Sequence, residues 1–353
     1  MEYVSLKKLI TFIIGSLILV VFVDVPGQLK ESSKLFPVSL NGKDGYIDRT
    51  GKIIIPLSYE GAGKFSEGLA PVKVKDKWGF IDESGGIVIA AQFSGACEFS
   101  EGLARVQVGG DKYGLNGEWG FIDRSGNIVI KPKYGELTGV NETSQGFHEG
   151  LAMIEVNYNK GFIDKSGKVV IRPRFRYAYH FTEGLASVKE ELKGKWGYID
   201  KSGRWAITPK FDWACLFSDG LASVDIKQHC GYINRVGNLV LQPQFNVGDC
   251  SIIHGHFSDG LSRWKIREKY GFISKNGSIA IEPKFDLAED FSEGLAAVNL
   301  RGKWGFVDRT GSFVAKPEFS HVNSFSGGLA RVVTDEGIGY INKEGTYVWN
   351  PTR

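Results

Sequence analysis

Two phrases decide the fold: Phe291-Ser292-Glu293-Gly294-Leu295-Ala296, and after it Lys303-Trp304-Gly305-Phe306-Val307-Asp308-Arg309-Thr310-Gly311. Both recur along almost the whole chain, and such self-similarity indicates a repeat architecture. The glycine of the second phrase recurs nine times, at Gly45, Gly79, Gly120, Gly161, Gly197, Gly231, Gly271, Gly305 and Gly339. The glycine of the first phrase recurs at Gly68, Gly102, Gly150, Gly184, Gly220, Gly260, Gly294 and Gly328. The basic unit is therefore 34 residues long, with insertions in some copies.

Each unit contains three short runs typical of β-strands. In one unit they are residues 297–300, 305–308 and 312–315, separated by turn residues and followed by Pro317. Runs of this length between glycine-containing breaks predict antiparallel hairpins, and proline belongs at the end of a strand. The segment after the proline is too short for a packed helix. We expect a helical turn or coil that crosses to the next unit, with Phe285 and Phe291 filling the space between neighbouring sheets.

The phrases resemble the WG-repeat (KWG, WG β-repeat) family of bacterial proteins. Lys-Trp-Gly stands intact at Trp78, Trp196 and Trp304, and Glu118-Trp119-Gly120 is close to it. In other units the tryptophan position holds Asp44, Lys160, Cys230, Tyr270 and Ile338. The resemblance covers roughly residues 36 to 350. It implies an array of small β-units, and the family has no agreed biochemical activity to carry over.

The fold class predicted is all-β, a tandem array of about nine three-stranded antiparallel meanders. The chain shows no unit split between its ends, and nine blades exceed the usual four to eight of a closed propeller. An open, twisting β-solenoid is therefore the expected architecture, and a β-propeller is the alternative.

The first residues read as a targeting segment. Lys7 and Lys8 precede a run of 15 uncharged residues, 9–23, which is the pattern of a signal peptide and is shorter than a comfortable membrane span. We expect residues 1–27 to form a hydrophobic helix that acts as a signal peptide or an N-terminal membrane anchor. Residues 28–35 are then a tether, and 36–353 the repeat array. Either form of the segment implies export, to an extracellular, periplasmic or cell-envelope location.

Composition argues against some partners. The net charge is only +3 over 353 residues, without a basic run, so nucleic acid is not an expected partner. Contact with a membrane is expected only through the N-terminal segment. The four cysteines, Cys97, Cys215, Cys230 and Cys250, form no disulfide framework. A bridge among the last three is left open, and buried thiols are favoured.

Two columns of acids recur with the repeat. The first stands two residues before Ser or Thr and three before Gly, the pattern of a hairpin turn stabilised by its own carboxylate. It comprises Asp48, Asp82, Asp123, Asp164, Asp200 and Asp308. The second comprises Glu67, Glu101, Glu149, Glu183, Asp219, Asp259 and Glu293. We expect this second column to fix its own Gly-Leu turn or to pair with lysine, because one carboxylate per turn is too few for calcium.

The candidate binding residues are an aromatic column: Trp78, Trp119, Trp196, Tyr270 and Trp304. Regularly spaced aromatic rings can stack on sugars, and can hold quaternary amines through cation–π contacts. A fixed place in every unit also suits packing between sheets. Packing is the favoured interpretation, and binding is the functional alternative.

The sequence contains few residues in patterns typical of a metal site or of nucleophilic catalysis. Cys250, His254 and His256 are the densest possible metal ligands, but their spacing matches no standard zinc pattern. His229-Cys230 places a base beside a thiol, although neighbouring strand residues point to opposite faces. Insertions at 109–117, 135–146 and 246–256 would form surface loops.

The expected function follows from the array. We expect no catalytic residues and no cofactor. The chain is predicted to be an interaction scaffold that binds a protein or a cell-envelope polymer through its extended surface. The alternative is cell-wall or glycan binding through exposed column aromatics. A hydrolase or metal site built on the insertions is the third hypothesis.

Overall fold

The computed structural model describes residues 7–14, 17–24, 35–110, 117–135, 137, 146–227, 229–241, 255–266 and 268–352. The chain divides into two compact units, Met1–Lys34 and Leu35–Arg353. Each is described by itself.

The first unit is a β-hairpin, and the expected hydrophobic helix is wrong. Strand β1 (Lys7–Ile14) pairs antiparallel with β2 (Leu17–Asp24), in a register that places Lys7 opposite Asp24. The run is rich in β-branched valine, isoleucine and threonine, whose stiff side chains favour strands over helices. Among the described residues, no helix is long and apolar enough to cross a bilayer.

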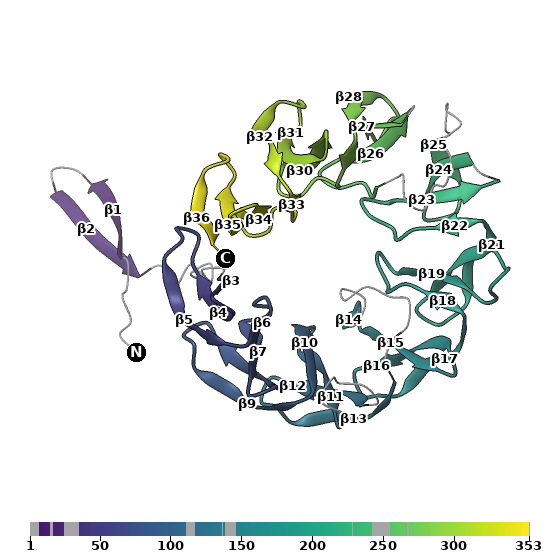
Figure 1. Cartoon of the computed structure of the whole chain (residues 1–353), viewed down its shortest axis with the longest axis horizontal. Helices are drawn as coiled ribbons and strands as arrows, with labels where there is room; N and C mark the ends of the chain where they lie inside the picture. Colours follow the sequence, from purple (N-terminus) through teal and green to yellow (C-terminus); the bar gives the residue numbers. More distant parts are fainter. Residues whose placement is uncertain are drawn as a thin grey trace. The chain divides into compact units, whose positions relative to one another are not determined.

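The second unit consists of nine small antiparallel sheets arranged in a ring (Figure 1), which we call blades 1 to 9 in chain order. Blade 1 consists of β3 (Phe36–Leu40), β4 (Lys43–Ile47) and β5 (Ile53–Tyr59). Blade 2 consists of β6 (Gly61–Ala62), β7 (Leu69–Val74), β8 (Lys77–Asp82) and β9 (Ile87–Phe93). Blade 3 consists of β10 (Gly95–Ser100), β11 (Leu103–Val108), β12 (Glu118–Asp123) and β13 (Ile128–Tyr134). Blade 4 consists of β14 (Phe147–His148), β15 (Leu151–Val156), β16 (Asn159–Asp164) and β17 (Val169–Phe175). Blade 5 consists of β18 (Tyr177–Ala178), β19 (Leu185–Lys189), β20 (Trp196–Asp200) and β21 (Trp205–Phe211). Blade 6 consists of β22 (Trp213–Ala214), β23 (Leu221–Ile226), β24 (His229–Asn234) and β25 (Leu239–Leu241). Blade 7 consists of β26 (Leu261–Ile266), β27 (Lys269–Ser274) and β28 (Ile279–Phe285). Blade 8 consists of β29 (Leu287–Ala288), β30 (Leu295–Leu300), β31 (Lys303–Asp308) and β32 (Phe313–Phe319). Blade 9 consists of β33 (His321–Val322), β34 (Leu329–Thr334), β35 (Gly337–Asn342) and β36 (Tyr347–Thr352).

The predicted meander is present in every blade, but most blades have a fourth strand. The crossing segment is not a helical turn. In blade 8 its two residues β29 pair with the next strand, Leu287 opposite Asn299 and Ala288 opposite Val298. The reason is that the exposed edge of the meander offers unpaired N–H and C=O groups, which a short extended segment satisfies. In Figure 1 these short strands, such as β10 and β14, lie on the inner side of the ring, and the last strands, such as β9 and β13, lie outside.

The glycine of the Trp-Gly phrase is required by a bulge between the third and fourth strands. The register shifts between Trp304 and Phe306, so the fourth strand crosses directly over Gly305. A Cβ atom at Gly305 would lie 2.5 Å from the backbone oxygen of Ala315. That separation is too short for any side chain, so only glycine fits.

The hydrophobic core lies between the blades. Eight apolar clusters each join one blade to the next, and Phe285 and Phe291 lie together in the cluster between blades 7 and 8, as expected. A ninth cluster joins the first blade to the last, through residues that include Phe36, Val38 and Tyr340.

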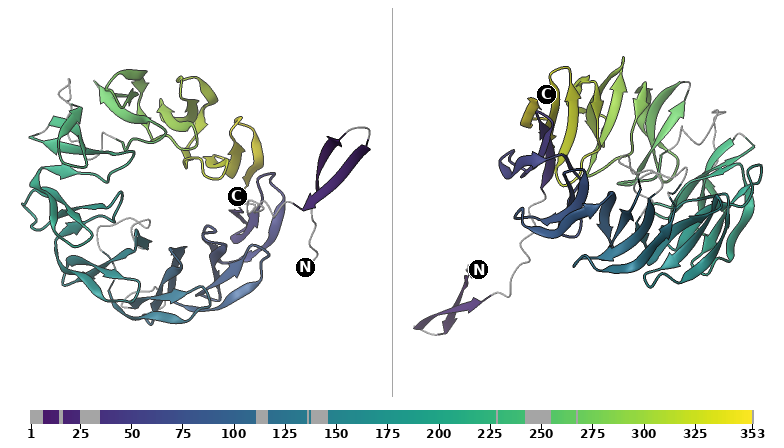
Figure 2. Two further views of the ribbon diagram at one scale, coloured as in Figure 1. Left: turned by 180° about the vertical axis from the view of Figure 1, so that it is seen from behind. Right: turned by 60° about the horizontal axis from the view of Figure 1, so that its bottom comes forward.

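This ninth cluster closes the ring, so the expected open solenoid is wrong and the alternative, a β-propeller, is correct. Tyr340 stacks edge-on against Phe36, with ring centroids 5.9 Å apart, and its hydroxyl donates to the carbonyl oxygen of Pro37 at 2.7 Å. Closure buries the apolar faces that blades 1 and 9 would expose at the ends of a solenoid. Figure 2 shows the ring from behind and tilted.

Candidate functional site

The first acidic column belongs to the turns. Asp48 Oδ1 accepts hydrogen bonds from the Thr50 backbone N–H (2.8 Å), the Thr50 hydroxyl (2.6 Å) and the Lys52 N–H (3.1 Å). These bonds, led by that of the hydroxyl, hold the pKa of Asp48 below its usual value. Asp82, Asp164, Asp200 and Asp308 repeat the same three bonds, and Asp123 bonds its own turn in a similar way. The predicted turn role is confirmed.

The second acidic column connects neighbouring blades, rather than only its own turn. Glu101 of blade 3 accepts the N–H of Gly150 of blade 4 at 2.9 Å. Lys165, also of blade 4, lies 3.1 Å from the same carboxylate. We call this arrangement the carboxylate clamp. The hydrogen bond from the glycine of the following blade recurs at Glu67, Glu149, Glu183, Asp219, Asp259 and Glu293. The lysine ion pair recurs at Glu149, Asp219 and Glu293.

The aromatic column lies largely inside the blade packing. Trp196 is 2% exposed and Tyr270 is 6% exposed. Trp78, Trp119 and Trp304 are half-buried, and the guanidinium of Arg105 lies 4.3 Å from the centroid of the Trp119 ring. None of the five is freely exposed, so they form no continuous platform.

One column residue lies at a pocket with a volume of about 290 Å³. Trp196 is joined there by three aromatic side chains that no repeat pattern predicted. Their ring centroids lie 5.7 Å from Trp196 for Tyr179, 5.1 Å for Trp213 and 6.0 Å for Tyr177. The remaining lining residues are Lys160, Ala178, Lys189 and Asp212. The pocket thus combines aromatic rings with a few charged groups, as small-ligand sites do.

The residues that line the pocket all lie at the same edge of the ring. In each four-stranded blade the first strand begins, the second ends, the third begins and the fourth ends at one edge, which we call the hairpin edge. The register shows this in blade 5, where Tyr177 pairs with Lys189 and Trp196 pairs with Phe211. The carboxylate clamps lie at the opposite ends of the strands. Blades 4, 5 and 6 all contribute to the pocket.

Departures from the repeat produce the pocket. Lys160 takes the tryptophan position of blade 4. Tyr177 and Trp213 take the first position of their blades, which varies along the ring: it is Gly61 in blade 2, Gly95 in blade 3 and Leu287 in blade 8. A comparison of units position by position could have identified them. The sequence could not show that Lys160, Tyr177 and Trp213, which belong to three neighbouring blades, lie together at one pocket.

The charges at the pocket are mostly compensated. Lys160 is 3% exposed, and its ammonium lies 3.2 Å from the carboxylate of Glu155. Asp212 is bonded by Lys195 and by the backbone N–H of Lys227, and these bonds, that of Lys195 foremost, lower the pKa of Asp212. Lys189 lies 5.7 Å from the centroid of the Tyr177 ring, and no carboxylate in the described part of the chain lies within ion-pair distance of it.

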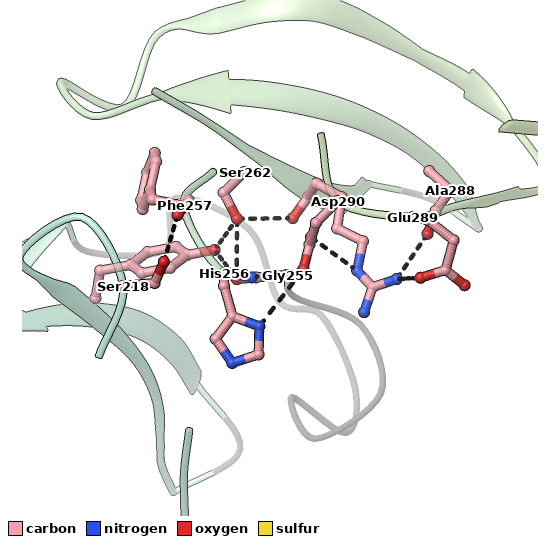
Figure 3. Close-up of polar contacts among 10 residues, drawn as sticks. Ser218, Gly255, His256, Phe257, Ser262, Ala288, Glu289 and Asp290 are labelled. Atoms are coloured by element: carbon pink, nitrogen blue, oxygen red, sulfur yellow. Dashed lines mark hydrogen bonds and ion pairs between the residues drawn. The ribbon is translucent and has the colours of Figure 1, made fainter. Parts of the chain in front are cut away.

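Of the metal candidates, Cys250 and His254 lie outside the described residues. His256 faces Asp290, with Nδ1 3.5 Å and the backbone N–H nitrogen 3.1 Å from Oδ2 (Figure 3). Arg263 joins the same cluster through Asp290, at 3.4 Å, and Glu289, at 2.8 Å. The cluster links blades 7 and 8. Within the described ranges no group of three or more His, Cys, Asp or Glu could hold a metal ion.

The remaining candidate residues lie in part outside the described chain. Most of the three insertions and the side chain of His229 are not described. Cys97 and Cys215 are not in a disulfide, whereas Cys230 is disulfide-bonded. The preference for free thiols therefore does not hold for Cys230.

Solved structures support the ring. A crystal structure of a eukaryotic initiation factor is 12% identical, with a TM-score of 0.60 over 89% of this chain and 95% of that one. At this identity the likeness shows the fold alone. Hsv2 of Kluyveromyces lactis (10% identity, 57% and 72% of the two chains, TM-score 0.38) and a streptogramin B lyase (13%, 72% and 93%, 0.36) are more distant in shape.

No curated protein matches the chain in sequence. The repeat described as "WG containing repeat" matches it eight times. The matched residues are 45–78, 78–113, 119–159, 161–195, 196–227, 231–270, 270–304 and 304–336. They span most of the ring and follow the period set by the Trp-Gly phrase, so the chain belongs to the WG-repeat family.

Proposed function

We propose that this chain is a non-catalytic scaffold that binds a macromolecular partner at the hairpin edge of its ring. The observation that carries the proposal is the pocket on blades 4 to 6, where residues that depart from the repeat come together. Repeat residues are occupied with holding the ring, so recognition falls to side chains that differ between blades.

The absence of catalysis is part of the proposal. It is supported by the engagement of the recurrent acids, since the turn aspartates and the clamp carboxylates are hydrogen-bonded to backbone N–H groups. A carboxyl group that acts as a general acid or base must be able to exchange its proton with a substrate. A bound partner should therefore be recovered chemically unchanged.

Export is the second part of the proposal, and it rests on the sequence. Lys7 and Lys8 followed by the apolar run 9–23 favour secretion, with or without retention of an N-terminal anchor. Fractionation of the producing cells, followed by N-terminal sequencing of the mature protein, tests it. Recovery of the intact chain in the cytosolic fraction alone would contradict export.

The binding proposal is tested by photo-cross-linking of the full chain in the cells that make it. A photoreactive side chain replaces Tyr177, which lies at the pocket and is 37% exposed. The control replaces Leu287, the equivalent first residue of blade 8, which is 47% exposed. We expect an adduct of defined mass at position 177 and none at 287. Equal adducts at both positions, or none at either, would contradict a partner at the pocket.

A further inference from the structure

The chemistry of the pocket narrows the kind of partner. Tyr179 stacks on Trp196 with an interplanar angle of 25°, and Trp213 is inclined by 56° to the same ring. The pocket is at the small end of the range for ligand sites, about 300 to 1,000 Å³. It therefore suits a single ring-sized group, whether free or part of a longer polymer, which can lie against an aromatic face.

The polar groups supply both donors and acceptors. The ammonium groups of Lys160 and Lys189 donate, and the carboxylate of Asp212 has lone pairs to spare. Hydroxyl groups, which donate and accept at once, match such a mixture. An apolar ligand would remove solvent from Lys189 and from the remaining lone pairs of Asp212 without replacing its hydrogen bonds, which costs free energy.

The charge balance favours an anionic group. Glu155 compensates Lys160, and Lys195 compensates Asp212. Lys189 has no carboxylate within ion-pair distance and acts on Asp212 only from farther away, so one positive charge is in excess, at the end of β19 beside Tyr177. A quaternary amine could use the aromatic faces, but it would meet the repulsion of Lys189. A nucleic-acid strand needs cations along its backbone, and one uncompensated ammonium is too few.

We infer that the pocket binds a carboxylate-bearing sugar ring, as found in a polysaccharide built from hexuronic acids. The sugar ring packs on Tyr179 and Trp213, its hydroxyls bond Lys160 and Asp212, and its carboxylate pairs with Lys189. The inference rests on the proposed function, because it names the class of partner for the same pocket.

The experiment measures binding of defined probes to the full chain by isothermal titration calorimetry. The main probe is an oligogalacturonate, and the matched probe is the same oligosaccharide with each carboxylate reduced to a hydroxymethyl group. Choline and a single-stranded oligonucleotide represent the other two ligand classes. We expect the oligogalacturonate to bind most tightly and to be recovered intact.

Two substitutions copy residues that other blades already carry, so the fold should tolerate them. Lys189→Asn copies Asn299 of blade 8, and Trp213→Gly copies Gly61 of blade 2. Lys189→Asn should weaken oligogalacturonate binding about tenfold, the loss typical of one charge-assisted hydrogen bond, and leave binding of the reduced probe unchanged. Trp213→Gly should weaken binding of both probes.

The controls are the same changes away from the pocket, Lys73→Asn in blade 2 and Leu287→Gly in blade 8, which should leave binding unchanged. Equal affinity for the reduced probe, preference for choline or the oligonucleotide, or no effect of Lys189→Asn would overturn the inference. If position 177 cross-links to a partner while oligogalacturonate fails to bind, the sugar assignment alone is wrong. If both fail, the proposed function is wrong as well.

Discussion

At the scale of the residue, close approach and burial decide which side chains are allowed. Gly305 lies under the backbone of β32, where a Cβ would come within 2.5 Å of the Ala315 oxygen. The tryptophan beside it is replaceable, and Lys160 or Cys230 can stand there. The glycine recurs in all nine units because its constraint is steric, whereas the tryptophan fills a space that other side chains can also fill.

Replacement of Gly305 by alanine should therefore destabilise the ring. We expect a loss of about 1 to 3 kcal/mol in the free energy of unfolding, because the backbone of β32 must move to admit the methyl group. Gly135→Ala is the control, since a Cβ there meets no atom within 4 Å and the residue has no positive φ. Urea denaturation compares the two variants, and equal stabilities would refute the steric explanation.

A second prediction at this scale concerns His180, which stacks on His148 with ring centroids 4.0 Å apart. Burial, together with His148 and His256 and against the opposing charge of Glu149, lowers the pKa of His180 from 6.5 to about 4. Between these values the unfolded chain binds the proton and the folded chain does not. The folded state is thus favoured above about pH 6.5 and loses that advantage, on the order of 3 kcal/mol, as the pH falls towards 4.

His180→Leu, which copies Leu216 of blade 6, should remove this part of the pH dependence. Unfolding free energies of the variant should change less than those of the native chain between about pH 6.5 and pH 4. His321→Leu, an exposed histidine in blade 9, is the control. Identical pH profiles for the native chain and His180→Leu would show that His180 is not the titrating group.

At the scale of the element, the blade is too small to be stable alone and depends on its neighbours. Each face of a blade is covered by the next, and the clamp adds a polar link at the edge opposite the pocket. Burial alone would raise the pKa of Glu101, but the bonds from Lys165 and the Gly150 N–H outweigh it, and the pKa lies below 4.5. The clamp therefore stabilises the folded state at pH values above the pKa that Glu101 has in the unfolded chain. This stabilisation is lost as the pH falls through the pKa that Glu101 has in the folded chain.

Glu101→Gln keeps an acceptor for Gly150 and removes the charge that pairs with Lys165. We expect the variant to be less stable than the native chain near neutral pH, with the difference shrinking below about pH 4.5. Chemical denaturation at several pH values measures this difference. Glu118→Gln, an exposed position of blade 3, should show no such convergence. A difference for Glu101→Gln that is constant with pH would contradict the clamp.

At the scale of the whole molecule, the seam between blades 1 and 9 differs from the other interfaces. Gly327 stands in blade 9 where Glu293 stands in blade 8, so the last blade has no carboxylate to offer blade 1. The contacts across the seam include an apolar cluster and the hydrogen bond from Tyr340 to Pro37. Closure thus depends strongly on a few aromatic residues.

Tyr340→Ala should destabilise both blade 1 and blade 9. We expect a loss of about 3 kcal/mol in stability and faster hydrogen exchange in both β3 and β35, although they are far apart in the chain. Phe306→Ala, at the interface of blades 8 and 9, is the control and should not affect exchange in β3. Unchanged exchange in β3 of Tyr340→Ala would indicate that blade 1 does not depend on the seam.

The repeat itself could be read from sequence because it rests on local chemistry. The turn aspartates and the glycine under the bulge fix strands and turns within a few residues of themselves. The proline expected at the end of the last strand lies inside it instead, as Pro317 does in β32 (Phe313–Phe319). The short first strand was missed, since two residues such as Leu287 and Ala288 carry no periodicity and become a strand only through their partners. The N-terminal strands were missed because an apolar run permits either a helix or a strand.

The sequence by itself determined the all-β class, the nine units and the family, because each unit repeats the same local constraints. Only the tertiary structure decided that the array closes, because closure depends on the angle between successive blades, a sum over the whole array that no single unit encodes. Likewise it decided the pocket, where Lys160, Tyr177 and Trp213 meet from three blades. Each is an isolated departure along the chain, and the packing of the blades brings them together.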